Sequence, residues 1–162
     1  CALTPDGAAD CWGWNFNGQA EDQPGPYDHV SAGFQHSCGL TPAGAVECWG
    51  DNTYGKAENR AGQFAQLSVG RDHTCALQLD GAAVCWGSNG AAQAGTRPGP
   101  YTQISAGELH TCALRSDTAV DCWGDYRFGQ NADQPGPFGP YRPGMMPRLF
   151  VPVAIHQTAD EG

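Results

Sequence analysis

The chain of 162 residues carries eight Lys and Arg against seventeen Asp and Glu, which gives a net charge of −9 at pH 7. Because the net charge is strongly negative and Lys56 is the single lysine, we expect no surface that could neutralise a run of phosphates, and nucleic acid is excluded as an expected partner. No stretch approaches the roughly 20 apolar residues that span a bilayer, so no membrane-spanning segment is expected. The even number of eight cysteines predicts oxidised pairs, and therefore an extracytoplasmic protein that is secreted, periplasmic or exposed at the cell surface.

The first predicted element is a β-hairpin over residues 1–11. Its two strands, Cys1-Ala-Leu-Thr and Ala8-Ala-Asp-Cys11, flank the turn sequence Pro5-Asp6-Gly7. A glycine in the left-handed conformation closes a three-residue hairpin loop, and this loop pairs residues 4 and 8, 3 and 9, 2 and 10, and 1 and 11. Cys1 and Cys11 then face each other, at the Cα separation of about 4.5 Å that a disulfide tolerates.

The same hairpin recurs along the chain in steps of 37 residues, and the second cysteine of every copy is followed by Trp-Gly. This register predicts four disulfides, each within one hairpin: Cys1–Cys11, Cys38–Cys48, Cys75–Cys85 and Cys112–Cys122. Bridges between neighbouring units stay open as the main alternative, since eight cysteines permit 105 connectivities. The ten-residue spacing and the lack of a Cys-x-x-Cys pair argue against a zinc site.

A third short strand is predicted before each hairpin from the second copy onward. Its pattern is aromatic-x-x-aliphatic-Ser-Ala/Val-Gly, as in the segment from Tyr27 to Gly33. The first copy has no such strand in front of it, and the fourth loses the pattern after Gly144. An apolar segment, 149–155, follows, and we expect it to be buried or to dock on another subunit. The predicted organisation is four units and a C-terminal extension: 1–37, 38–74, 75–111, 112–144 and 145–162.

The repeated pattern Gly-x-x-His-Ser/Thr-Cys-x-Leu, followed by Cys-Trp-Gly-x-Asn-x-x-Gly-Gln, resembles the repeat of the regulator of chromosome condensation superfamily. The second copy shows it at Gly33 to Leu40 and at Cys48 to Gly55. The short unit and its cysteine pair are similar to the secreted bacterial type, including the β-lactamase inhibitor protein of this repeat class. The resemblance implies an all-β β-propeller in which each unit is a small antiparallel blade. Members typically close with seven blades, so four units imply a partial propeller, one completed by oligomerisation, or a distinct four-unit construction.

No catalytic set can be recognised, and no cofactor or metal is expected. Three histidines repeat with the unit, at His36, His73 and His110, and equivalent positions in successive units cannot all be one active site. We expect each imidazole to be hydrogen-bonded to neighbouring backbone. The four Trp-Gly tryptophans are expected to pack between blades, with the indole N–H bonded to backbone.

The candidate protein contacts are loop aromatics and part of the apolar segment: Trp14, Phe16, Tyr54, Tyr126, Phe128, Leu149, Phe150 and Val151. Aromatic side chains of this kind serve as anchors at protein interfaces. The alternative is that the loop aromatics simply rest on the neighbouring hairpin.

These observations favour a non-enzymatic, extracytoplasmic protein-binding or scaffold module, such as an accessory subunit of a larger assembly. The expected partner is another protein or further copies of the same chain. Two alternatives stay open: an inhibitor of a secreted enzyme such as a β-lactamase, by analogy with the repeat class, and a carbohydrate-active or other propeller enzyme.

Overall fold

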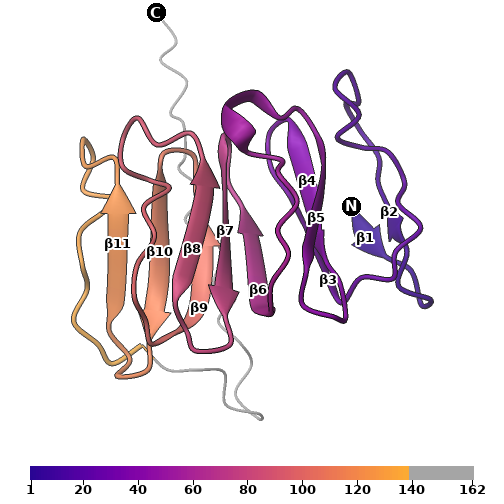
Figure 1. Ribbon diagram of the computed structural model, residues 1–162. Helices are drawn as coiled ribbons and strands as arrows, with labels where there is room; N and C mark the ends of the chain where they lie inside the picture. Colours follow the sequence, from indigo (N-terminus) through magenta and orange to yellow (C-terminus); the bar gives the residue numbers. More distant parts are fainter. Residues whose placement is uncertain (139–162) are drawn as a thin grey trace, which may run out of the picture.

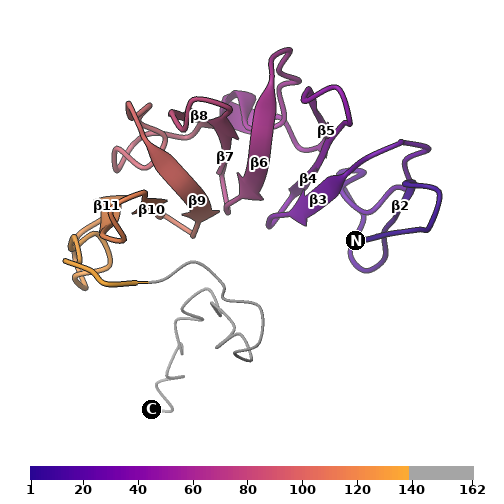
Figure 2. The same ribbon diagram turned by 90° about the horizontal axis from the view of Figure 1, so that it is seen from below.

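A computed structural model describes residues 1–138, which form four small antiparallel β-sheets arranged side by side in an open arc (Figures 1 and 2). The C-terminal extension, with its candidate contacts Leu149, Phe150 and Val151, lies outside the described residues. No helix within residues 1–138 is long and apolar enough to cross a membrane.

The first sheet has two strands and each of the other three has three strands. The first sheet contains β1 (Ala2–Leu3) and β2 (Ala9–Asp10). The second contains β3 (His29–Ala32), β4 (His36–Leu40) and β5 (Val46–Gly50). The third contains β6 (Phe64–Val69), β7 (His73–Gln78) and β8 (Ala83–Gly87). The fourth contains β9 (Tyr101–Ala106), β10 (His110–Arg115) and β11 (Val120–Gly124). A short 3₁₀ turn, η1 (Thr53–Gly55), follows β5.

The predicted hairpin register and disulfides are confirmed. In the second sheet Cys38 lies opposite Cys48, and the corresponding cysteines pair in the third and fourth sheets. All four bridges close within one hairpin, with Cα atoms 4.0 to 4.1 Å apart. The turn glycines Gly7, Gly44 and Gly81 take the left-handed conformation that the loop requires, with φ between 81° and 86°. In the fourth sheet Thr118 occupies this position, with φ of 72°.

Each three-stranded sheet has the same orientation in the arc. The strands β3, β6 and β9 lie on its concave side and β5, β8 and β11 on its convex side (Figure 2). The apolar core lies between facing sheets: Leu40, Val46, Leu67 and Trp86 pack between the second and third. A second cluster, built around Leu77, Ala113 and Trp123, fills the space between the third and fourth. A single sheet is too thin to enclose a core, so its stability depends on its neighbours.

The repeated tryptophans are buried only where another sheet precedes them. Trp86 and Trp123 are buried, and Trp49 is half-buried against the ring of Tyr27, with centroids 6.0 Å apart. Trp12 is 71% exposed, because it belongs to the first sheet and no described residue covers it. The expectation that all four tryptophans pack between blades is therefore wrong for Trp12.

The expected backbone partner of the indole is found once. Trp123 donates its indole N–H to the carbonyl oxygen of Gln93 at 3.0 Å. The indole nitrogens of Trp49 and Trp86 are buried without a hydrogen-bond partner among the described residues. Instead, the guanidinium of Arg60 lies over the ring of Trp86, 5.3 Å from its centroid, and stabilises it by a cation–π contact.

The repeated histidines His36 and His73 connect neighbouring sheets through hydrogen bonds to side chains. The expectation that each imidazole bonds to neighbouring backbone is therefore wrong for these two histidines. Nε2 of His36 lies 2.8 Å from the hydroxyl oxygen of Thr74 in the third sheet, and that hydroxyl donates to the carbonyl of Lys56 at 2.8 Å. His73 and Thr111 repeat the contact at 2.8 Å. Since each threonine hydroxyl gives its proton to a carbonyl, the histidine Nε2 carries the proton in these contacts.

Serines add a second connection between sheets on the concave side. The backbone N–H of Val69 donates to the hydroxyl of Ser31 at 3.0 Å, and that of Ala106 donates to Ser68 at 2.9 Å. The concave edge strands thus have part of their free backbone groups satisfied by the preceding sheet.

Candidate functional site

Two sets of loops meet at one end of the sheets, at the top of Figure 1, and we call this end the upper face. One set joins the concave strand of each three-stranded sheet to its middle strand, and the other follows the last strand of every sheet. Because His36 pairs with Gly50, both loops of the second sheet emerge at the same end, and Asp51 N–H donates to the Gln35 carbonyl at 2.8 Å. The upper face therefore collects loops from all four sheets.

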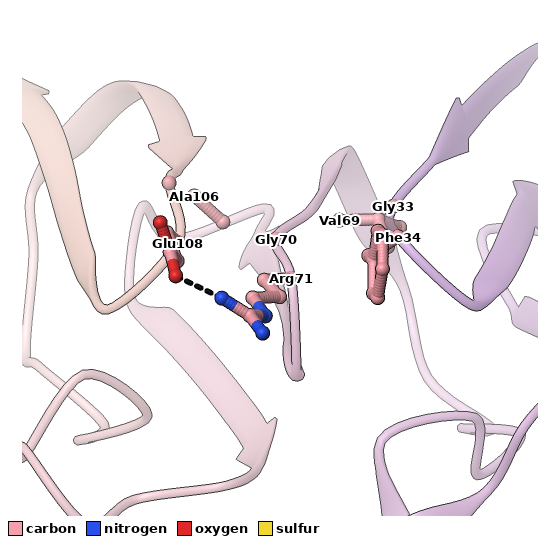
Figure 3. Close-up of a pocket in the computed structure, with 8 residues that line it drawn as sticks. Gly33, Phe34, Val69, Gly70, Arg71, Ala106 and Glu108 are labelled. Carbon is pink, nitrogen blue, oxygen red and sulfur yellow. Dashed lines mark hydrogen bonds and ion pairs between the residues drawn. The ribbon is translucent and has the colours of Figure 1, made fainter. Parts of the chain in front are cut away.

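Three residues at equivalent repeat positions form a row across the upper face. Phe34, Arg71 and Glu108 each follow the glycine that comes directly after a concave strand, and they are 37 residues apart. An Arg71 guanidinium N–H donates to the carboxylate of Glu108, and the guanidinium carbon lies 5.4 Å from the ring centroid of Phe34. These side chains border a hollow of about 450 Å³ with an apolar floor that includes Val69 and Ala106 (Figure 3).

The glycines before Phe34 and Arg71, which are Gly33 and Gly70, allow the turns of neighbouring sheets to lie close together. A Cβ atom added to Gly33 would overlap the carbonyl oxygen of Gly70, and one added to Gly70 would overlap that of Gly107. Only glycine allows the turns of successive sheets to approach this closely. The side chains that follow these glycines are therefore held next to one another at the rim of the hollow.

An aromatic patch, which we define as Phe16, Trp14 and Phe34, continues the row toward the first sheet. The rings of Trp14 and Phe16 are stacked, with centroids 6.3 Å apart, and the Trp14 and Phe34 rings are 6.2 Å apart. Phe16 is 83% exposed, and Trp14 and Phe34 are each 56% exposed. Such large exposed rings in mutual contact are unusual on a surface that faces only water.

The other candidate aromatics also lie on the upper face. Tyr54 is 70% exposed at η1, and Tyr126 and Phe128 are 75% and 87% exposed in the loop after β11. The equivalent loop of the third sheet has small residues at 90–92 and no aromatic ring. The five sequence-predicted loop aromatics are thus in solvent on one face, while only Trp14 and Phe16 contact each other.

A buried lysine, Lys56, joins the upper-face loops of the second and third sheets by ion pairs. The ammonium of Lys56 lies 2.8 Å from the carboxylate of Asp51 and 2.7 Å from that of Asp72. Burial opposes the charge of Lys56, but the two carboxylates outweigh it and raise its pKa. Hydrogen bonds from Lys56 and Thr53 lower the pKa of Asp51 to about 2. The three other repeats have glutamine at this position: Gln19, Gln93 and Gln130.

The histidines and carboxylates at the junctions between sheets are buried or paired with basic side chains. Within residues 1–138 no group of three or more His, Cys, Asp and Glu side chains is placed to hold a metal ion. Burial lowers the pKa of His36 and of His73 to about 4. Asp51, Asp72 and Glu108 each pair with a basic side chain. The arrangement offers contact surface and a fixed ion pair, which suits recognition.

The row of Phe34, Arg71 and Glu108 was missed by sequence reasoning. The signal was present, because the three residues share one position in successive repeats. Reading the repeat across its copies at that position, rather than along one copy, would have placed them side by side.

Disulfide-closed antiparallel sheets, set side by side in an arc with their loops gathered at the ends, define a β-propeller-type repeat protein. The family model of the regulator of chromosome condensation (RCC1) repeat matches residues 27–56, 64–93 and 101–130, which is more than half of the chain. The chain belongs to this repeat family. A comparison with curated proteins returned no significant match.

Solved structures agree with the assignment of the fold. The CRINKLY WD40 ectodomain of the Arabidopsis thaliana receptor kinase ACR4 is 26% identical, with a TM-score of 0.70 over 83% of this chain and 49% of that one. The ectodomain of the Physcomitrella patens receptor kinase CR4 is 30% identical, with a TM-score of 0.56 over 65% of this chain and 32% of that one. Yeast RCC1 (Prp20), solved in complex with Kap60, is 16% identical, with a TM-score of 0.61 over 71% of this chain and 39% of that one, and shows the fold alone. The chain spans half or less of the length of these structures.

Proposed function

We propose that the chain is a non-enzymatic, extracytoplasmic protein-binding module and that it contacts its partner through the upper face. The observation that carries this proposal is the gathering of exposed aromatic rings on that face, with the ring of Trp14 against those of both Phe16 and Phe34. Tyrosine, tryptophan, phenylalanine and arginine are enriched at the centres of protein interfaces, where they provide most of the binding energy.

The rigidity of the upper-face loops supports the same proposal. Lys56 ties two loops together, and Glu108 and Phe34 hold the guanidinium of Arg71 from two sides. Side chains that are already ordered in the free protein lose less entropy on binding. Loops that present such residues from a fixed scaffold are typical of recognition sites.

The extracytoplasmic location is supported by two independent features. Four disulfides persist in oxidising compartments and are rare in the cytosol. The two plant receptor kinase structures that resemble this chain are ectodomains.

The proposal is tested by capturing proteins from the extracellular fraction of the source organism on the immobilised, disulfide-intact chain. The variant Phe16→Ser/Phe128→Ser changes two upper-face rings, and Leu79→Ser is the matched control, since Leu79 is 69% exposed in the turn after β7, at the other end of the sheet. We expect a protein to be retained by the wild type and by Leu79→Ser and to be lost from the double variant. Equal retention by all three chains would show that the upper face is not the contact surface.

The native mass of the isolated protein separates the two kinds of partner. If the partner is a second copy of the chain, the wild type sediments as an oligomer and Phe16→Ser/Phe128→Ser sediments as a monomer. A monomeric wild type that binds another polypeptide at fixed ratio is a subunit of a hetero-complex.

A further inference from the structure

Charge is unevenly distributed along the arc. Residues 1–55, which include the first two sheets, contain seven Asp and Glu and no Lys or Arg. Residues 56–138, which include the third and fourth sheets, contain eight Asp and Glu and six Lys and Arg. The aromatic patch of Phe16, Trp14 and Phe34 therefore lies on the more acidic half of the molecule, whose formal side-chain charge is −7 before the pairing of Asp51 with Lys56 is counted.

We propose that the aromatic patch binds lysine or arginine side chains from a basic segment of a protein partner. This inference rests on the proposed function and names the chemistry of the partner. The faces of aromatic rings attract cations because the π-electrons make them electronegative, and the attraction grows where water is excluded.

The chain itself shows this mode of contact at the edge of the patch. The guanidinium of Arg71 lies over the ring of Phe34, 5.4 Å from its centroid, and Glu108 pairs with it from the other side. A cation thus sits between an aromatic face and a carboxylate. The partner's basic side chains would repeat this arrangement on Trp14 and Phe16, whose rings have no cation of the chain over them among the described contacts.

A carboxylate lies in the same loop as the exposed rings. Glu21 is exposed, and its Oε1 lies beside Gly18, two residues after Phe16. Glu21 forms no ion pair with another side chain of residues 1–138. A basic segment that stacks on the rings could therefore pair with this carboxylate, and the surrounding negative charge would speed its approach.

The fourth sheet provides a natural contrast. Its loop after β11 also exposes two rings, Tyr126 and Phe128, but Arg127 stands between them and pairs with Asp125 at 2.6 Å. Residues 12–23 of the first loop contain two carboxylates, Glu21 and Asp22, and no basic residue, whereas residues 123–134 contain two carboxylates and Arg127. The two aromatic loops are thus equivalent in the fold but differ in local charge, and the more negative first loop is the better site for a cation.

The test uses fluorescently labelled peptides of repeated Gly-Arg, Gly-Glu and Gly-Ser, titrated with the disulfide-intact full chain and followed by anisotropy at physiological salt. We expect the Gly-Arg peptide alone to bind. The variant Trp14→Ala/Phe16→Ala should weaken its binding at least fivefold, as expected for two cation–π contacts at exposed sites. The matched variant Tyr126→Ala/Phe128→Ala, in the equivalent loop, should change binding less than twofold. Circular dichroism verifies that both variants are folded, and Phe16→Ala alone provides a milder substitution with a smaller loss in the same direction.

Two results would overturn the inference. If Trp14→Ala/Phe16→Ala binds Gly-Arg as tightly as the wild type, the attraction comes from net charge alone. If Gly-Ser binds as well as Gly-Arg, the patch does not select cations. In either case a captured protein that depends on Phe16 and Phe128 would leave the proposed function standing, so the two failures are distinguishable.

Discussion

Nε2 of His36 donates to the hydroxyl of Thr74, 38 residues away and one sheet further along the arc, at 2.8 Å. The threonine hydroxyl in turn donates to a backbone carbonyl. The sheets are thus joined by buried relays of two hydrogen bonds, and the first prediction concerns this relay.

We expect Thr74→Val to lower the free energy of unfolding by about 2–4 kcal/mol, because it leaves the His36 N–H and the Lys56 carbonyl buried without partners. Valine has nearly the volume of threonine, so the loss reports the hydrogen bonds. Urea unfolding followed by tryptophan fluorescence measures it. The exposed Thr96→Val, whose hydroxyl has no hydrogen-bond partner among the described residues, is the control, and a change below about 0.5 kcal/mol for Thr74→Val would contradict the relay.

The second prediction concerns pH. Burial, together with nearby positive charge, lowers the pKa of His36 and of His73 to about 4, below the ordinary value of about 6.5. Above pH 6.5 both imidazoles are neutral in the folded and the unfolded chain, and their contribution to stability is complete. As the pH falls from 6.5 toward 4, the unfolded chain takes up protons that the folded chain does not, so stability is lost, by at most about 3 kcal/mol for each histidine. Urea midpoints measured between pH 7.5 and 4 should fall accordingly.

His36→Gln/His73→Gln serves as the control for this slope. The amide group can still donate to the threonine hydroxyl but does not titrate. A midpoint that falls equally in this variant between pH 6.5 and 4 would assign the effect to other groups.

The third prediction concerns Lys56. The glutamines at the equivalent positions accept a hydrogen bond from the backbone N–H two residues earlier, as Gln93 does from Ala91 at 2.8 Å. Both Lys56→Met and Lys56→Gln leave the carboxylates of Asp51 and Asp72 without a cation, so both should destabilise, Lys56→Met by about 2–3 kcal/mol. Lys56→Gln should lose less, because its amide can accept the backbone hydrogen bond and donate to one carboxylate. Urea unfolding measures both losses, and a Lys56→Met chain as stable as the wild type would contradict a stabilising role for the ion pairs.

The fourth prediction concerns the turn of the fourth sheet. Thr118 has a φ of 72°, where the other three turns have glycine, and a β-branched residue is strained in this conformation. We expect Thr118→Gly to raise the free energy of unfolding by about 0.5–1 kcal/mol, because the relief of strain exceeds the entropy that glycine adds to the unfolded chain. Thermal unfolding measures the gain. The reverse change, Gly81→Thr, should destabilise the third sheet.

The fifth prediction concerns the disulfides. Full reduction should add eight hydrogens to the intact mass, since all eight cysteines are paired. Cys75→Ser/Cys85→Ser should lower stability by about 3 kcal/mol or more, because it opens a short loop and places hydroxyls in the core. Cys1→Ser/Cys11→Ser, at the exposed end, should have the smaller effect, and the opposite order would contradict the placement of the core between sheets.

What could be predicted from the sequence is what happens within one repeat. The pairing of Cys38 with Cys48 follows from the turn at Gly44, because a hairpin register is a local matter of turn geometry. The partner of His36 and the exposure of Trp12 could not be predicted in this way. These depend on which residues of the next sheet face a given position, and periodicity shows only that positions are equivalent. The row of Phe34, Arg71 and Glu108 has the same origin, since it exists only when three sheets stand side by side.

Every disulfide of this chain is local, whereas neighbouring sheets are held to each other by packing, hydrogen bonds and ion pairs. A molecule pulled from its two ends would therefore release its sheets one after another. In each repeat of 37 residues the bridged cysteines are ten positions apart, and the segment between them cannot be extended. Each release therefore lengthens the chain by at most about 95 Å, against about 130 Å after reduction. The redox state of the surroundings thus determines the increase in chain length for each sheet that unfolds under tension.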